Sequence, residues 1–157
     1  MTSQHLMIAV SAIYFLTPMG LATAGSAIEE VGALACVVDK WDEKEQEKGH
    51  KLVDYAGRCI AVPHDASTAS YSEDCTGKYE YMPDGAWRGD GTCTRSLKGG
   101  DKIFDSFQEG SHLKEYTYQT TGGTGKYQGA TGSGTYNLDN LSDTLQGGRF
   151  KGKLLLH

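Results

Sequence analysis

The amino-acid sequence predicts an all-β protein, an antiparallel closed β-barrel of about eight strands that follows an N-terminal signal peptide. Polar and apolar residues alternate in short runs separated by Gly, Asp and Asn, and no long stretch keeps a helical period. The 157 residues include 21 Gly and 9 Tyr but only 3 Pro, a composition that favours tight turns and pleated surfaces. A closed barrel removes the edge strands that invite aggregation, and an eight-stranded barrel can hold one small ligand.

Residues 1–24 are predicted to be a signal peptide. The stretch is apolar, contains no Lys, Arg, Asp or Glu, and ends in Ala-Thr-Ala, a pattern that signal peptidase accepts. A permanent membrane anchor is the alternative, but Pro18 and Gly20 shorten the apolar run below the ~20 residues that span a bilayer. We therefore expect cleavage after Ala24, which leaves residues 25–157 as one secreted or periplasmic barrel domain with no membrane span.

The four cysteines all follow the predicted cleavage site, and their even number suits disulfides in an oxidising compartment. No C-x-x-C spacing occurs, which argues against a zinc site or a thioredoxin-like dithiol, and we expect no metal and no cofactor. A hairpin turn at Asp84-Gly85 would bring Cys75 nearly opposite Cys93, one residue out of register, so that a bulge would be required. Of the three pairings that four cysteines allow, we favour Cys75–Cys93 with Cys36–Cys59.

The first two strands are predicted at residues 33–39 and 50–62. The second is expected to be kinked or bulged at Gly57, because glycine inside a strand often marks such a site. The charged run at 42–48 mixes both signs, which is typical of a solvated loop or a hairpin end. Residues 61–77 are polar and are expected to connect the second strand to the third.

Four further strands are predicted from alternation between residues 78 and 120. Each places a set of side chains on one face: residues 78–82 with Tyr79 and Tyr81, residues 92–97 with Cys93, Arg95 and Leu97, residues 102–109 with Ile103, Asp105, Phe107 and Glu109, and residues 112–120 with Tyr116 and Tyr118.

The stretch "TGGTGKYQGATGSGTY" at residues 121–136 repeats the pattern G-x-G-x-Y, at 123–127 and again at 132–136. A phosphate-binding loop does not fit, because no helix follows and Lys126 precedes a tyrosine where a P-loop has Ser or Thr. Two tyrosines also interrupt what would otherwise be a flexible linker. We predict paired strands around a tight connection, with the tyrosines packed over the space that the glycines leave. A final strand is predicted at residues 149–157, with Phe150, Leu154 and Leu156 on one side.

This glycine-rich stretch resembles the G-G-T-G-x-[FY]-x-G-x-x-G signature of the allene oxide cyclase and dirigent-like β-barrel superfamily. The preceding "LKEYTYQT" and the closing "GRFKGKLLLH" fit the same pattern. The segments "YEYMPDGAW", "GTCT", "GDKIFD" and "EGSHLKEY" resemble an uncharacterised secreted bacterial branch. The resemblance implies an eight-stranded, lipocalin-like barrel with a central pocket, often in dimers or trimers, so a homo-oligomer is an open expectation. Some members cyclise or rearrange a hydrophobic epoxide or steer phenoxy coupling. The matching motif is structural and identifies no catalytic residue.

The charge of the chain argues against one class of partner. Its net charge is −5, whereas a nucleic-acid-binding protein normally needs a basic patch to displace counterions from phosphates. We therefore expect no nucleic-acid partner.

The function expected is the binding of a small hydrophobic or phenolic molecule in the central cavity. One alternative is a cofactor-free isomerase or cyclase, and a second is a structural or inhibitor protein that acts through its loops. Asp105 and Glu109 are the candidate catalytic groups, because a carboxyl in an apolar barrel can keep its proton near neutral pH. Arg95 could pair with such a carboxylate or with an anionic ligand. The candidate ligand-binding walls are the four tyrosines of the alternating strands, Tyr79, Tyr81, Tyr116 and Tyr118.

Overall fold

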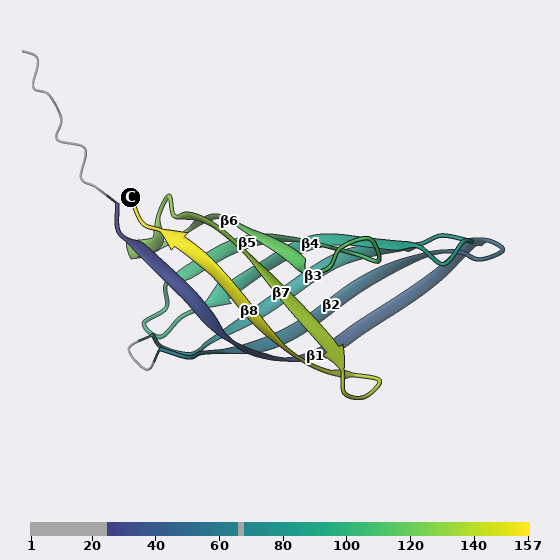
Figure 1. Ribbon diagram of the computed structural model, residues 1–157, viewed down its shortest axis with the longest axis horizontal. Helices are drawn as coiled ribbons and strands as arrows, with labels where there is room; N and C mark the ends of the chain where they lie inside the picture. The colour runs from purple at the N-terminus through teal and green to yellow at the C-terminus, as the bar shows by residue number, and fades with distance from the viewer. Residues whose placement is uncertain (1–24, 66–67) are drawn as a thin grey trace, which may run out of the picture.

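A computed structural model describes residues 25–65 and 68–157, so the signal peptide expected at residues 1–24 lies outside the described residues. Eight antiparallel strands follow one another around a closed barrel, and the last strand pairs with the first (Figure 1). The predicted fold class is therefore confirmed. The strands are β1 (Ala27–Glu47), β2 (His50–Pro63), β3 (Tyr71–Tyr81), β4 (Trp87–Ser96), β5 (Lys102–Gly110), β6 (Tyr116–Gly123), β7 (Thr131–Asn140) and β8 (Leu145–Leu155).

All the strands predicted outside the glycine-rich stretch overlap an observed strand, and most of the observed strands are longer. The largest error concerns the polar connection expected at residues 61–77, because β3 already begins at Tyr71. The first half of β3 carries three consecutive polar residues, Ser72, Glu73 and Asp74. These residues obscured the alternating pattern in which Tyr71, Glu73 and Cys75 share one face of the strand. This error matters for function, since Glu73 lies inside the barrel.

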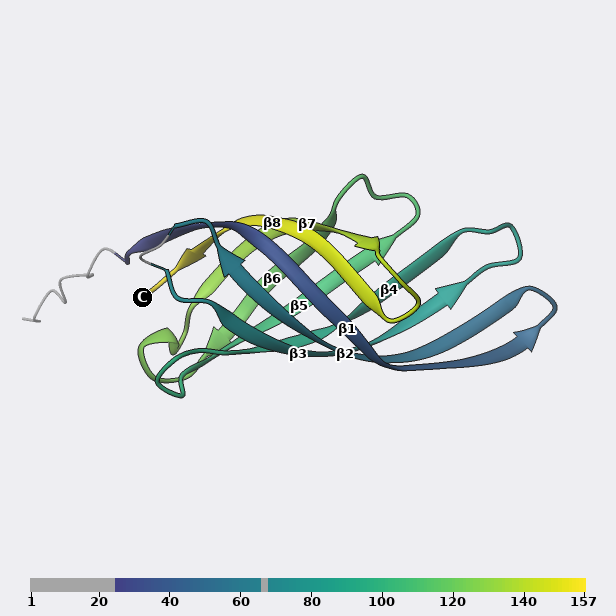
Figure 2. The same cartoon turned by 90° about the horizontal axis from the view of Figure 1, so that it is seen from below.

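The two ends of the barrel differ. The turns of the hairpins β1–β2, β3–β4, β5–β6 and β7–β8 lie at one end, and the first two of these hairpins project furthest (Figures 1 and 2). The charged run at 42–48 forms the exposed end of the β1–β2 hairpin, as the sequence indicated. The C-terminus and the connections β4–β5 and β6–β7 lie at the opposite end, which is closed by an apolar layer of Ile103, Tyr127, Ala130 and Leu154.

A β-bulge in β1 sets which side chains enter the open end. The pairs Val38↔Gly57 and Lys40↔Ala56 leave Asp39 as the extra residue. Because side chains alternate along a strand, one extra residue reverses the face of everything beyond it. The bulge therefore turns Trp41 toward the interior. The bulge predicted at Gly57 on β2 is present at this position, but its extra residue, Asp39, lies on the partner strand β1.

The glycine-rich stretch is only partly the hairpin that was predicted. Its second G-x-G-x-Y unit lies on β7 and pairs with β6, whereas the first unit forms the connection and a 3₁₀ turn, Gly125–Tyr127. Glycine is needed where aromatic rings cross the strands: a Cβ on Gly134 or Gly152 would overlap the ring or hydroxyl of Tyr118. The tyrosine that packs over these glycines thus comes from β6.

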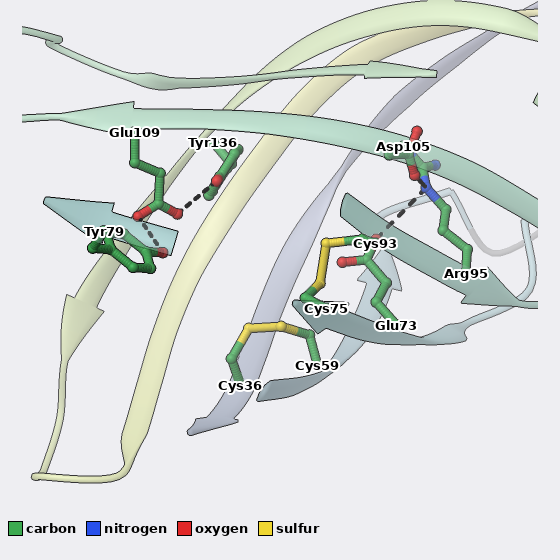
Figure 3. Close-up of a disulfide and its surroundings, with 10 residues drawn as sticks. All are labelled: Cys36, Cys59, Glu73, Cys75, Tyr79, Cys93, Arg95, Asp105, Glu109 and Tyr136. Atoms are coloured by element: carbon green, nitrogen blue, oxygen red, sulfur yellow. Dashed lines mark hydrogen bonds and ion pairs between the residues drawn. A yellow bond between two sulfur atoms is a disulfide. The ribbon is translucent and has the colours of Figure 1, made fainter. Parts of the chain in front are cut away.

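Both predicted disulfides are present, and each joins two residues directly opposite each other on neighbouring strands. Cys36 on β1 bonds Cys59 on β2, and Cys75 on β3 bonds Cys93 on β4 (Figure 3). The bulge expected beside the second disulfide is absent, because β3 and β4 are joined by five residues, 82–86, which restores the direct register. The side chains of all four cysteines line the barrel interior.

Candidate functional site

The barrel interior contains two adjoining spaces. The inner cavity lies near mid-barrel and has a volume of about 60 Å³, while the mouth at the open end has a volume of about 630 Å³. The two spaces share four lining residues, Tyr55, Tyr79, Glu109 and Leu138, which form the floor of the mouth. The other residues that line the mouth are Val38, Trp41, Tyr81, Trp87, Tyr116, Asn140, Leu141, Ser142, Asp143 and Gln146.

A buried ion-pair network, here called the arginine cluster, surrounds Arg95 on β4. The Nε atom of Arg95 donates to Oδ2 of Asp105 at 2.6 Å, and its Nη1 atom donates to both carboxylate oxygens of Glu30, at 2.8 and 2.9 Å. Thr120 donates to Oδ1 of Asp105 at 2.7 Å, and a carboxylate oxygen of Glu73 lies 3.6 Å from Arg95 Nε. The cluster thus joins β1, β3, β4, β5 and β6 across the barrel.

Aromatic rings enclose the guanidinium of Arg95 as well. The rings of Tyr71 and Tyr118 each have their centroid 5.2 Å from its central carbon, close enough for cation–π attraction. Among the described residues, no buried side-chain nitrogen or oxygen lacks a hydrogen-bond partner. A buried charge network of this kind is stable only when every member is satisfied, and this one meets the condition.

Glu73 is the member of the cluster whose protonation bears on chemistry near neutral pH. Burial raises its pKa to about 7, an increase that Arg95 opposes and that the nearby charges of Asp105 and Glu30 reinforce. A carboxylate oxygen of Glu73 also lies within 4.8 Å of the sulfurs of Cys59 and Cys75. Both sulfurs are in disulfides, and because metals bind thiolates, this group is not a metal site in the oxidised protein.

Glu109 occupies the floor of the mouth, between the two spaces. Tyr79 donates a hydrogen bond to its Oε2 at 2.9 Å, and Tyr136 donates to its Oε1 at 2.6 Å (Figure 3). Burial raises the pKa of Glu109, while these two hydrogen bonds act in the opposite direction. The pKa values of both tyrosines are raised well above their ordinary range, because burial and the neighbouring carboxylate disfavour a phenolate.

Seven aromatic side chains, here called the aromatic rim, extend from this floor to the edge of the mouth. Neighbouring rings have centroids 5.2 to 6.4 Å apart, within the range of favourable aromatic pairs. The rim draws on six of the eight strands. Its members are Trp41, Tyr55, Tyr79, Tyr81, Trp87, Tyr116 and Tyr136.

The structure divides the residues singled out from the sequence between the two spaces. Arg95, Asp105 and Tyr118 line the inner cavity, whereas Tyr81 and Tyr116 line the mouth. Tyr79 and Glu109 line both. The two candidate acids therefore share a face of β5 but have different partners, since Asp105 pairs with Arg95 and Glu109 accepts hydrogen bonds from tyrosines.

Among the residues of the site that were not singled out from the sequence, five show why. Glu30 lies on the same face of β1 as Ile28, Leu34 and Cys36. The alternation of this strand could therefore have identified Glu30 as an inward-facing residue. Glu73 was assigned to a connection, and Trp41 depends on the bulge. The remaining two residues, Trp87 and Tyr136, lie at a strand start and in the glycine-rich stretch.

Within the ranges that the structure describes, no helix has the length and apolar character needed to cross a membrane. No protein-family model matches the sequence, and no curated protein sequence matches it.

Solved structures do match the fold. The pterocarpan synthase dirigent protein GePTS1 superposes with a TM-score of 0.56 at 11% sequence identity, over 94% of this chain and 99% of that chain. The pterocarpan synthase dirigent protein PsPTS1 gives a TM-score of 0.51 at 10% identity, over 84% of this chain and 96% of that chain. At such low identity the likeness concerns the backbone arrangement alone. The chain therefore has the fold of the dirigent-like β-barrels.

Proposed function

We propose that this protein binds a small hydrophobic or phenolic molecule in the mouth of its barrel and acts outside the cytoplasm. The observation that carries the proposal is the mouth itself, about 630 Å³ of space walled by the aromatic rim with one carboxylate at its floor. Ligand sites are typically concave, mostly apolar and supplied with a few placed polar groups. The two disulfides suit an oxidising compartment.

The chemistry of the walls suits an aromatic ligand. A ring that enters the mouth can pack edge-to-face against Trp41, Trp87 or Tyr116, and a phenolic hydroxyl can hydrogen-bond at Glu109 or its tyrosine partners. The fold likeness to two dirigent proteins named as pterocarpan synthases supports a ligand of this class.

Calorimetric titration with 4-tert-butylphenol tests the proposal, together with native mass spectrometry of protein from its source. We expect the phenol to bind, and Leu138→Trp to abolish binding, because Leu138 lies at the floor of the mouth where a larger side chain fills the space. Leu155→Trp is the matched control, since Leu155 is an exposed leucine outside the mouth. Absence of any phenol binding and of any co-purified small molecule would exclude the proposed site.

A second candidate function is a cofactor-free isomerase or cyclase. Two buried carboxyl groups favour it, Glu73 in the inner cavity and Glu109 at the floor of the mouth, because burial raises the pKa of each and so moves it toward the range in which a carboxyl can act as a general acid. Asp105 stays a candidate, although its hydrogen bonds also hold Arg95 and Thr120.

Turnover of the molecule identified by native mass spectrometry would test the catalytic function. The variants Glu73→Gln, Asp105→Asn and Glu109→Gln replace each acid by its amide, and we expect one of them to lose turnover while still binding the molecule. If all three variants keep full turnover, none of these acids is essential; if the unchanged protein shows no turnover, the catalytic function itself is excluded.

A further inference from the structure

The charged side chains that line the mouth are all acidic. Glu109 and Asp143 are the ionisable carboxylic acids among the residues that line it, and none of the lining residues is Lys, Arg or His. Just beyond the lining, the carboxylate of Asp139 adds to the field, since it contributes to raising the pKa of Tyr116. Glu43 also lies beyond the lining, but it is paired with Lys51 at 2.9 Å and therefore adds little net charge.

The buried arginine cannot offset this field. Arg95 lines the inner cavity and not the mouth, and it is surrounded by Glu30, Asp105 and Glu73. An anion that entered the mouth would therefore meet a carboxylate before it met a cation. A positively charged group would meet Glu109 directly.

The aromatic rim also favours a cation. The faces of Trp, Tyr and Phe carry negative electrostatic potential, and cation–π attraction is strongest for Trp. Trp41 is 40% exposed, so part of its surface is open to a ligand. Six of the seven rings line the mouth together with Glu109, and aromatic side chains grouped in this way can hold an ammonium group.

We infer that the ligand of the mouth carries a positively charged organic ammonium group, which contacts Glu109 while rings of the aromatic rim pack around it. The inference rests on the proposed function and adds the charge of the ligand to it. Tyr79 and Tyr136 donate to the two oxygens of Glu109, and this fixes the carboxylate at the floor of the mouth. A fixed carboxylate beneath apolar walls discriminates charge more strongly than an exposed one, because water screens it less.

Two ligands of the same shape provide the test. The trimethyl(4-hydroxyphenyl)ammonium ion and 4-tert-butylphenol differ in one central atom, nitrogen with a charge or carbon without one. Both tryptophans of the chain lie in the mouth, so quenching of intrinsic fluorescence excited at the tryptophan edge reports on this site, and calorimetry gives the affinity. We expect the cation to bind about tenfold or more tightly than the neutral phenol.

Glu109→Gln should remove most of the preference for the cation over the neutral phenol, measured as the ratio of the two affinities, and a single cooperative thermal transition shows that the variant is folded. Asp143→Asn is the matched control: it removes an exposed carboxylate of the same mouth, and we expect it to keep most of the preference.

The outcomes separate this inference from the proposed function. If the two ligands bind equally, or the neutral one binds more tightly, the ammonium inference is overturned while the binding site stands. If Glu109→Gln leaves the preference intact, Glu109 is not the recognising group and the inference is also overturned. If neither ligand binds and no small molecule co-purifies with the protein, the proposed function itself fails.

Discussion

Glu73 belongs to a polar run of β3, yet its carboxyl lies between Arg95 and the sulfurs of two disulfides. With a folded-state pKa of about 7 and an ordinary value of 4.5, it binds its proton more tightly in the folded protein than in the unfolded chain. Its contribution to stability is therefore fully present below pH 4.5 and is lost as the pH rises through about 7.

This linkage predicts that replacing Glu73 by Gln changes how stability depends on pH. Relative to the Gln variant, the original protein should lose about 3 kcal/mol of unfolding free energy between pH 4.5 and pH 8. Urea unfolding of both proteins at both pH values measures this, and taking the difference between the proteins cancels the other carboxylates. An equal difference at the two pH values would contradict the assignment.

At this scale the sequence predicted which side chains face inward better than it predicted their partners. Alternation placed Arg95, Asp105 and Glu109 on the faces that carry Leu97, Ile103 and Phe107. It could not show that Glu30, 65 residues from Arg95 in the chain, would supply a carboxylate to it. That contact depends on which strands meet across the barrel, and local patterns do not contain this information.

Among the strands, β7 shows how a sheet makes room for an aromatic ring. Gly134 faces Tyr118 on the neighbouring β6, and a methyl group at Gly134 would overlap both that ring and the carbonyl oxygen of Lys151. Gly152 on β8 leaves space for the hydroxyl end of the same side chain. The glycines thus determine where Tyr118 can lie in the inner cavity.

We predict that Gly134→Ala destabilises the protein by about 1 to 3 kcal/mol, the usual effect of overpacking. Thermal unfolding should show a lower Tm than for the unchanged protein. Ser133→Ala, at the exposed neighbouring position of the same strand, should leave the Tm nearly unchanged. An equal effect of the two substitutions would mean that backbone propensity, not the contact with Tyr118, is responsible.

The bulge in β1 marks the limit of what alternation predicts for whole strands. Strict alternation from Cys36 would turn Trp41 outward, and only the extra residue at Asp39 brings its ring into the mouth. The polar composition beyond Asp39 also concealed that β1 continues to Glu47. The hairpin pairing with β2, rather than local propensity, keeps this segment extended.

For the molecule as a whole, the closed barrel was predictable from the number of strands and from the need to remove edges, whereas the mouth was not. Figure 2 shows that the β1–β2 and β3–β4 hairpins extend beyond the other strands, and the size of the mouth depends on this extension.

The outer surface of the barrel carries an exposed apolar patch. Four aliphatic residues on the outside of β1 and β2 are 43 to 59% exposed, namely Val31, Val37, Ile60 and Val62.

We predict that this outer face is covered by a second copy of the chain, because exposed apolar patches commonly mark interfaces. Light scattering coupled to size exclusion should report an oligomer, and Ile60→Lys should shift it toward monomer. Phe104→Lys is the control, since Phe104 is an exposed apolar residue on β5, away from this face. A monomeric mass for the unchanged protein at micromolar concentration would contradict the prediction.

The order of the disulfides along the chain has a consequence for how the protein matures. Each bond joins cysteines that are consecutive in the sequence, Cys36 with Cys59 and Cys75 with Cys93, and each is closed by a single hairpin. The first bond can therefore form before the third cysteine has emerged from the ribosome or crossed a membrane. Oxidation in order of synthesis would yield the native pairing directly, so we expect maturation to require an oxidant but no isomerase that exchanges mispaired bonds.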